Sequence, residues 1–573
     1  MNRCAVWAPN ASRVEVETSG SRLLMTPVQC GWFELRGAEL KTGDDYSFVL
    51  DGGTTRPDPR SAWQPHGVHG ASRAVDHGAF SWTDHTWRGR PLADVVVYEA
   101  HIGTFTERGT LDGAVERIPH LAALGVGAVE LLPVSAFPGS RGWGYDGVDL
   151  YAVHEAYGGP DALKRFVDAC HASGIAVVMD VVYNHLGPDG NYLGEFGPYF
   201  TDRHRTPWGD AINYDGAGSD EVRRFVVDNA VMWLRDYHCD GLRLDAVHAI
   251  VDTSAVHLLE EIATAVHDLS IDLGRELWVI AESDLNDPRV VNSLSRGGYG
   301  CDAQWSDDFH HALHASLTGE TSGYYADFGR VEDVALSLRN VFVNPGGYSP
   351  FRQRRHGRPV GDLPATDFLG YLQNHDQVGN RAQGERSAAL MSVGRLQIAA
   401  ALVLLGPFVP MLFAGEEWAA STPFQYFTDH QDPGLGRLVS DGRRREFASF
   451  GWDPADIPDP QDPATFARST LRWDELELEP HATMLRWYRE LSALRASTPG
   501  LRDGDRAAGS VEFGEAGRWL VMRRAGLTVA CNWGDGPAHL HVRESAVVMT
   551  NVAPSWTERG LLLEPDAVVV TRD

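Results

Sequence analysis

The sequence predicts an α/β protein, a (β/α)8 TIM barrel between an N-terminal β-sandwich and a small C-terminal β domain. Three observations predict it: alternating runs up to about residue 90, eight apolar runs separated by amphipathic segments from residue 95, and renewed alternation after residue 499. Alternation with a period of two is typical of half-exposed strands, whereas unbroken apolar runs between helices are typical of buried parallel strands. The expected domains are residues 1–90, 91–498 and 499–573.

The N-terminal region is expected to form a small β-sandwich. Its short runs, such as CAVWAP, RVEVET and GWFELRG, are separated by turn residues. The stretch 54–70 is rich in Pro, Gly and His, and we expect irregular chain there that packs against the next domain.

The barrel prediction depends on eight candidate strands. They cover residues 95–103, 126–134, 175–185, 241–247, 277–283, 303–309, 368–376 and 408–417. Segments such as 112–125 and 221–238 lie between them and have apolar positions at helical spacing. Charged or polar residues follow each apolar run, and in such barrels the carboxyl ends of the strands form the active-site face.

The predicted barrel is longer than the ~250 residues typical of the fold, so insertions are expected. One covers about 186–218 and is predicted to be a loop; the other covers about 319–366. The uncharged stretch Ile398–Gly415 is about as long as a membrane span, but Gly406, Pro407 and Pro410 interrupt it. A buried helix followed by a buried strand explains both features, and no membrane association is expected.

Charge and cysteine content narrow the class of protein. The formal net charge of −28 disfavours binding to nucleic acid. Six scattered cysteines without a C-x-x-C pair argue against a disulfide framework or a structural zinc site. The N-terminus has no signal-peptide pattern, and we therefore expect a cytoplasmic protein.

Three carboxylates follow three of the predicted strands: Asp245, Glu282 and Asp376. A single acid at a strand end is usually a helix cap or a solvated loop charge, but three together suggest chemistry. Arg243 lies two residues before Asp245 on one strand, so both side chains point to the same side and the cation would keep Asp245 ionised. An ionised carboxylate about 5–5.5 Å from a protonatable one is what glycosidic cleavage with retention requires.

Four short motifs identify the chain as similar to the α-amylase superfamily. They are DVVYNH (180–185), GLRLDAVH (241–248), VIAES (279–283) and NHDQ (374–377), in the expected order. The resemblance implies that Asp245 is the nucleophile and Glu282 the general acid and base. It implies that Asp376 supports the oxocarbenium-like transition state. It also implies that Arg243, His185 and His375 hold the central sugar and that Tyr145 stacks on it.

Longer strings resemble the maltooligosyltrehalose trehalohydrolase family over essentially the whole chain. Examples are LLPVSAFPGSRGWGYDGV (131–148) and LQNHDQVGNRAQGER (372–386). The resemblance implies a maltooligosyltrehalose substrate, an α-glucan oligosaccharide, whose α-1,4 linkage next to the terminal trehalose is hydrolysed to release trehalose. The further substrate contacts that it implies are His248, Asp307, Asp308, His311, Gln377 and Asn380.

The sequence leaves rival functions open. A glycogen or starch branching enzyme and an α-1,6-debranching enzyme share the layout and the three acids. A non-catalytic glucan-binding protein is the rival from another class, and the intact acids argue against it. Most of the 17 tryptophans are expected in the core, with Trp143 and Trp208 as candidate sugar platforms.

No metal and no organic cofactor are expected. His310 and His314 have the spacing of a helical metal pair but lack a third ligand. Asn184 stands where calcium-binding amylases have a ligand, yet the further oxygen donors of a calcium cage cannot be assigned.

Overall fold

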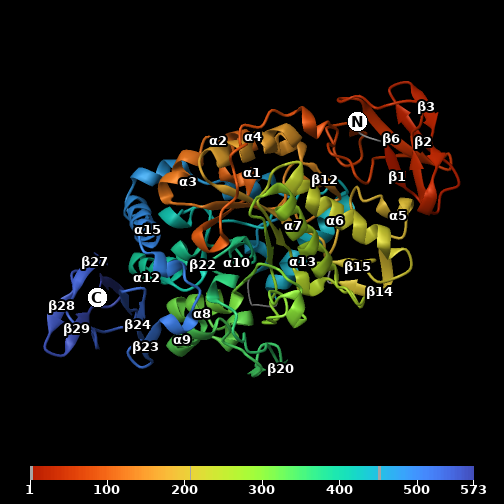
Figure 1. The fold of residues 1–573 in the computed structure, drawn as a ribbon. Coiled ribbons are helices and arrows are strands. Elements are labelled where there is room, and N and C mark those ends of the chain that lie inside the picture. The colour runs from red at the N-terminus through yellow and green to blue at the C-terminus, as the bar shows by residue number, and fades with distance from the viewer. Residues whose placement is uncertain (1–3, 207, 449–452, 573) are drawn as a thin grey trace.

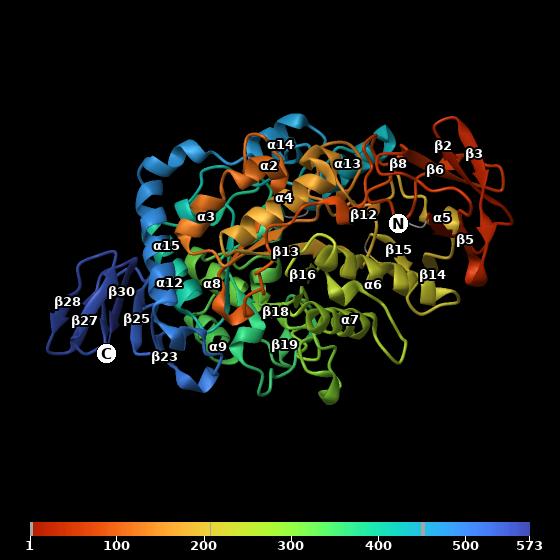
Figure 2. The same ribbon diagram turned by 45° about the horizontal axis from the view of Figure 1, so that its top comes forward.

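The computed structural model describes residues 4–206, 208–448 and 453–572. A closed barrel of parallel strands occupies the centre, and a β domain lies at each end of the molecule, as both ribbon views show (Figures 1 and 2). The first and the last described residues therefore lie on opposite sides of the barrel. The predicted fold class is confirmed.

Eight parallel strands form the barrel. They are β9 (Val97–Ala100), β10 (Ala128–Leu131), β13 (Ala176–Val181), β16 (Gly241–Leu244), β17 (Trp278–Ala281), β18 (Ala303–Trp305), β21 (Phe368–Gly370) and β22 (Val409–Phe413). The main covering helices are α4 (Gly159–Ala172), α6 (Ser219–Arg235), α7 (Leu258–Leu273), α8 (Asp307–Thr318), α12 (Val393–Leu405) and α15 (His481–Ala496). Each strand coincides with one of the eight apolar runs in the sequence.

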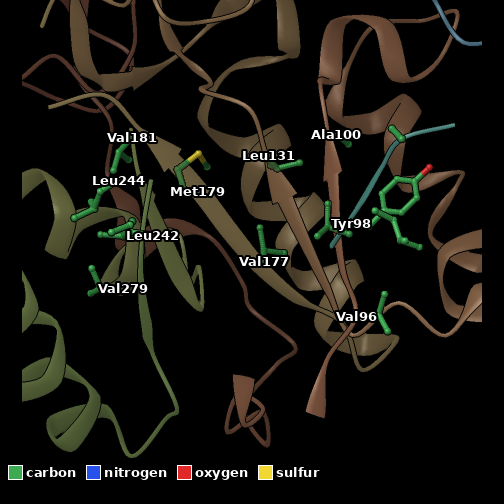
Figure 3. Packing of buried hydrophobic residues seen from close by; sticks show 14 of the residues in the cluster. Val96, Tyr98, Ala100, Leu131, Val177, Met179, Val181, Leu242, Leu244 and Val279 are labelled. Atoms are coloured by element: carbon green, nitrogen blue, oxygen red, sulfur yellow. The ribbon is translucent and has the colours of Figure 1, made fainter. Parts of the chain in front are cut away.

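Alternate side chains of the strands pack outward and inward. The outward residues, including Val177, Met179, Leu242 and Leu244, form the core beneath the helices (Figure 3). Inward residues such as Val97, Ala128 and Val178 form a second apolar cluster inside the barrel. Because the period along a strand is two, the residue two positions after each of these also points inward. Those next inward positions are Glu99, Glu130 and Asp180, and Arg243 lies between outward Leu242 and Leu244.

Each terminal domain consists of two antiparallel sheets. The N-terminal sheets are β1 (Ala5–Trp7), β5 (Trp32–Glu34) and β4 (Thr26–Pro27), and β3 (Ser21–Leu24), β2 (Val14–Thr18), β6 (Asp45–Leu50), β7 (Thr55–Arg56) and β8 (Ser72–Arg73). The C-terminal sheets are β23 (Ser510–Gly514), β24 (Trp519–Arg524), β25 (Leu527–Asn532), β30 (Ala567–Arg572) and β27 (Ala546–Thr550), and β26 (Ala538–Leu540), β29 (Gly560–Leu563) and β28 (Ser555–Thr557).

The insertions contain more regular structure than the sequence suggests. The predicted loop at 186–218 holds the short helix α5 (Leu193–Phe196) and a hairpin of β14 (Phe200–Thr206) and β15 (Gly209–Ile212). Strand β14, FTDRHRT, has no buried face, so it lacks the apolar alternation that reveals a strand. The 319–366 insertion holds α9 (Val331–Asn340), and α13 (Pro433–Ala448), which the sequence did not predict, follows the last barrel strand.

The uncharged stretch Ile398–Gly415 has the structure that the sequence predicts. Helix α12 ends at Leu405, and the barrel strand β22 begins at Val409. Both are buried within the protein. Among the described residues, no helix combines the length and the apolar character that crossing a membrane requires.

Candidate active site

A cavity of about 510 Å³ opens at the carboxyl ends of the barrel strands. It is lined by all three predicted catalytic acids, Asp245, Glu282 and Asp376. Six of the predicted substrate contacts line it too: Tyr145, His185, Arg243, His248, His375 and Asn380. The structure thus brings together residues that lie up to 235 positions apart in the chain.

Arg243 is the central cation of this cavity. Its Nη1 donates to Asp180 Oδ2 at 2.7 Å and to Asp245 Oδ1 at 2.9 Å, and its Nη2 lies 2.8 Å from Glu282 Oε2. The guanidinium is also 4.2 Å from the centroid of the Trp305 ring, an arrangement typical of a cation–π contact. One buried cation therefore faces three carboxylates.

Asp245 is held in its ionised form. Asn184 Nδ2 donates to its Oδ2 at 2.7 Å and to its main-chain oxygen at 2.8 Å. Burial alone would raise the pKa of Asp245, but the charges of Arg243 and His185 and the Asn184 hydrogen bond outweigh it, so the pKa is lowered. An ionised carboxylate in a buried site is what a nucleophile requires.

Glu282, in contrast, is held in its protonated form. Its Oε2 accepts a hydrogen bond from Ala246 N at 2.7 Å and lies 2.8 Å from Arg243 Nη2, whereas Oε1 makes no hydrogen bond with the described residues. Burial, together with the negative charges of Asp245 and Asp376, raises its pKa well above the usual value despite Arg243. Ala246 adopts φ +38°, which residues with a Cβ rarely do, and from there its N–H donates to Glu282. Glu282 can therefore hold a proton beside an ionised Asp245.

Asp376, the third acid that lines the cavity, belongs to the short helix α10 (His375–Gly379). Its Oδ1 accepts from Asn380 Nδ2 at 2.5 Å, and Asn380 in turn accepts from Arg443 Nη1 at 3.1 Å. Arg443 belongs to α13, and its guanidinium lies 5.2 Å from the Tyr426 ring centroid. Arg443 and Tyr426 also line the cavity, although neither is among the site residues predicted from the sequence.

The two tryptophans proposed as sugar platforms differ in exposure. Trp208 is 51% exposed and stacks on the His185 ring at 4.6 Å, so its other face is open to solvent. Trp143 is 6% exposed, donates Nε1 to Gln425 O at 3.0 Å and stacks on Phe424. Trp208 has the geometry of a platform, whereas Trp143 forms part of the wall.

Four predicted substrate contacts do not line the cavity: Asp307, Asp308, His311 and Gln377. Asp308 Oδ2 accepts from Val343 N, Asn344 N and Asn286 Nδ2, which ties down the loop after α9. Asp307 accepts from Tyr371 at 2.5 Å, and the ring of His311 packs against Tyr325. The backbone N–H of Gln377 donates to the capping side chain of Asn374. A sugar contact by these four stays a prediction.

His310, His314 and Asn184 each contact protein atoms. His310 Nδ1 lies 2.6 Å from Leu372 O, and His314 Nε2 lies 2.7 Å from Glu320. Asn184 directs its amide protons at Asp245. Within residues 4–206, 208–448 and 453–572, no group of three or more His, Cys, Asp or Glu side chains could hold a metal ion.

Three buried carboxylates beneath the cavity were missed: Glu99, Glu130 and Asp180. Each interrupts an otherwise apolar strand, as in VVVYEA, AVELL and VVMDVV. A charge within a buried strand is costly unless it is paired or neutralised, so such an interruption signals either a partner, as for Glu99 and Asp180, or a carboxyl whose pKa burial raises, as for Glu130. Asp180 pairs with Arg243 and accepts from Tyr145 at 2.6 Å.

A closed (β/α)8 barrel with an ionised and a protonatable carboxylate on one guanidinium defines a glycoside hydrolase of the α-amylase type. The family model for the alpha amylase catalytic domain matches residues 79–205. The chain is 54% identical to the malto-oligosyltrehalose trehalohydrolase of Arthrobacter ramosus over 93% of both chains. It is 49% identical to that of Rhizobium sp. (strain M-11) over 100% of this chain and 98% of the relative. The chain belongs to the malto-oligosyltrehalose trehalohydrolase family.

A solved structure agrees with this assignment at the level of the fold. A protein from Salmonella typhimurium, provisionally described as an alpha amylase, superposes with a TM-score of 0.91 at 38% identity. The match covers 99% of this chain and 97% of that protein. Both terminal β domains and the barrel are therefore shared.

Proposed function

We propose that this protein is a retaining glycoside hydrolase that cleaves the α-1,4-glucosidic linkage next to the terminal trehalose of maltooligosyltrehalose. The products are trehalose and a maltooligosaccharide. The relatives that carry this activity in their names match nearly the full length of the chain. The observation that carries the chemistry is that Arg243 binds Asp245 and Glu282 at once while their pKa values move in opposite directions.

The first half of the reaction forms a covalent intermediate. Asp245 attacks the anomeric carbon, and the bond from that carbon to the glycosidic oxygen breaks. Glu282 transfers its proton to this oxygen, so trehalose leaves as a neutral alcohol. The negative charge of Asp376 favours the oxocarbenium-like transition state between the two bonds.

The second half restores the enzyme. Glu282, now ionised, takes a proton from a water molecule, and the water oxygen attacks the anomeric carbon. The bond to Asp245 breaks, and the maltooligosaccharide departs with its original α configuration. The substrate is neutral, so the net charge of −28 does not slow its encounter with the protein.

Product analysis with three substrates tests the proposal. With maltooligosyltrehalose we expect free trehalose and one maltooligosaccharide per cleavage. Amylose and a branched glucan serve as parallel substrates, and Asp245→Asn protein is the control for contaminating activity. New α-1,6 branches in amylose or linear chains from the branched glucan would replace the proposal with a branching or debranching activity. Binding of the glucans without any product would indicate a non-catalytic protein.

We also propose a cytoplasmic location. All six cysteines are free, and Cys170, Cys239, Cys301 and Cys531 are buried. Unpaired thiols are typical of proteins in a reducing compartment. Fractionation of the source cells, with the enzyme activity measured in each fraction, tests this location.

A further inference from the structure

Glu99 binds the histidine that precedes the third acid. It lies at the carboxyl end of β9, and its Oε1 is 2.6 Å from His375 Nδ1. Its Oε2 accepts the main-chain N–H of His375 at 2.8 Å. In the barrel, β22 lies between β9 and β21, the strand that leads to His375, so Glu99 reaches past one strand to make both contacts. Both residues are buried, with 1% and 2% exposure.

This contact determines which ring nitrogen of His375 faces the substrate. A carboxylate accepts hydrogen bonds, so the proton of Nδ1 is directed at Glu99. Nε2 makes no hydrogen bond within the described part of the chain, and the ring lines the catalytic cavity. Tyr145 stacks on the ring at 5.1 Å, and Trp143 meets it edge-on at 5.6 Å, which restricts its rotation.

The charges around His375 favour the imidazolium. Burial favours the neutral ring, but the negative charges of Glu99 and Asp376 outweigh burial and the opposing charge of Arg243, so the pKa of His375 is raised. In the imidazolium, Nε2 carries a proton as well as Nδ1 and is a hydrogen-bond donor. The titratable or charged groups around the ring are Glu99, Asp376, Arg243, Asp245, Tyr145 and His101.

We propose that Glu99 is a positioning residue for catalysis: it holds the His375 imidazolium so that Nε2–H donates to a hydroxyl group of the bound sugar. The same carboxylate fixes the main chain next to Asp376 through the His375 N–H. This inference rests on the proposed function, because the acceptor of the Nε2–H hydrogen bond is the bound sugar. The protonation state of His375, by contrast, can be measured without any substrate.

Glu130 provides a matched control for a Glu99 variant. It pairs in register with Glu99 on the neighbouring strand β10 and is equally buried, at 1% exposure. Neither of its carboxylate oxygens has a hydrogen-bond partner among the described residues, and burial raises its pKa well above the usual value. Glu130→Gln therefore replaces a neutral acid by a neutral amide of the same shape. Glu99→Gln makes the same replacement of a carboxyl oxygen by an amide nitrogen, but it removes the negative charge that faces His375.

The first experiment follows the ring of His375 by NMR, with ¹³C-labelled histidine and the His375→Asn variant to assign the signal. We expect the pKa of His375 to be above that of an ordinary histidine in wild type and in Glu130→Gln, and to fall in Glu99→Gln. An ordinary pKa in wild type would overturn the proposal, and this measurement needs no variant of Glu99 to fold. It also stands if the natural substrate proves not to be maltooligosyltrehalose.

The second experiment measures kcat/KM against pH with α-maltotriosyl fluoride, because fluoride leaves without the proton from Glu282. Glu99→Gln should lower kcat/KM at neutral pH by about tenfold to a hundredfold, by analogy with the cost of losing a carboxylate that orients a metal-bound histidine. Its alkaline limb should move to lower pH, since His375 now loses its proton earlier. Glu130→Gln should keep the wild-type profile.

A double-mutant cycle separates positioning from a general structural role. If Glu99 acts through His375, Glu99→Gln has no further effect on kcat/KM in a His375→Asn background. Full additivity of the two losses would overturn the proposal, as would a wild-type pH profile in Glu99→Gln.

Discussion

The two ends of the barrel contain buried charge in different proportions. At the carboxyl end, Arg243 contacts Asp180, Asp245 and Glu282, so negative charge is in excess. At the amino end, Asp240 precedes strand β16 and contacts two cations. Its Oδ2 lies 2.9 Å from His171 Nε2, and its Oδ1 accepts from Arg275 Nη2 at 3.0 Å.

The amino-end cluster binds the segment that joins the N-terminal domain to the barrel. His171 Nδ1 lies 2.8 Å from Asp84 Oδ2, and Trp87 Nε1 donates to Asp240 Oδ1 at 2.6 Å. Burial would lower the pKa of His171, but the two carboxylates raise it; burial would raise the pKa of Asp240, but His171 and Arg275 lower it. Both shifts favour the charged forms of His171 and Asp240.

The comparison separates stabilising charge from reactive charge. Where cations match anions, each group stays ionised and the cluster holds two parts of the chain together. Where carboxylates exceed cations, one of them must retain a proton, and this gives the acid and the nucleophile that the reaction needs. Variants at the carboxyl end should therefore affect activity, whereas variants at the amino end should affect stability.

The largest expected effect is on activity in Asp245→Asn. Without the nucleophile, kcat with maltooligosyltrehalose should fall by at least about 10⁴-fold. The melting temperature should stay close to that of wild type, because the change removes one of the three carboxylates that surround Arg243 and leaves the other two in place. Initial rates and thermal unfolding measure both. A variant that kept the wild-type rate would show that Asp245 is not the nucleophile.

Glu282→Gln should show a loss that depends on the leaving group. Cleavage of maltooligosyltrehalose should fall by about 10²- to 10⁴-fold, because the glycosidic oxygen needs a proton. Formation of the glycosyl-enzyme from α-maltotriosyl fluoride should fall much less, since fluoride needs none; rapid-mixing kinetics of fluoride release measures this step. Equal losses with both substrates would contradict the acid role.

The pH dependence of wild-type kcat/KM should follow the same two groups. The pKa of Asp245 is lowered and that of Glu282 is raised. Activity should be lost in acid only as the pH falls through the low pKa of Asp245. It should be lost in alkali as the pH rises through the high pKa of Glu282. The plot of kcat/KM against pH should therefore be a broad bell-shaped curve. In Glu282→Gln the alkaline loss due to Glu282 should be absent, so that the remaining alkaline limb is that of the His375 imidazolium.

Asp240→Asn should affect stability rather than chemistry. Breaking a buried charge pair by removing one partner costs about 3–5 kcal/mol, here in the free energy of unfolding. The kcat of the folded protein should be unchanged. Denaturant unfolding and initial rates measure the two quantities, and a fall in kcat without a fall in stability would reverse the contrast between the barrel ends.

The stability from the amino-end cluster has its own pH window. The folded-state pKa of His171 is raised, so its contribution is complete below the unfolded-state pKa, about 6.5, and is lost as the pH rises through the folded value. The folded-state pKa of Asp240 is lowered, so its contribution is complete above about 3.9 and is lost as the pH falls through the folded value. The Asp240→Asn loss should be largest between these limits.

The smallest effect is expected for Trp208→Ala. Loss of one stacking surface should raise KM about two- to tenfold with little change in kcat. The matched control is Trp82→Ala, which removes a ring that stacks on His238 at the other end of the barrel. Trp82→Ala should leave KM unchanged, and a similar rise in both variants would remove the case for Trp208 as a sugar platform.

The sequence predicted the barrel and the three acids for a physical reason. Buried parallel strands must be apolar on both faces, so their runs are visible, and a charge directly after a run is equally visible. The polar hairpin of β14 and β15 and the helix α13 show no such pattern. Arg443 reaches the cavity because α13 forms part of the cavity wall. The roles of Glu99 and Asp180 depend on partners on other strands, which spacing along the chain does not reveal.

The central claim is that Asp245 forms a covalent bond to the sugar. A 5-fluoro-α-maltosyl fluoride reacts at the first step but slows the second, so the intermediate accumulates and can be weighed. Mass spectrometry of the intact protein should show one added 5-fluoromaltosyl group, because only the anomeric fluoride leaves, and peptide mapping should place it on Asp245. An adduct on another carboxylate, or turnover to a product of inverted configuration without any adduct, would contradict the account.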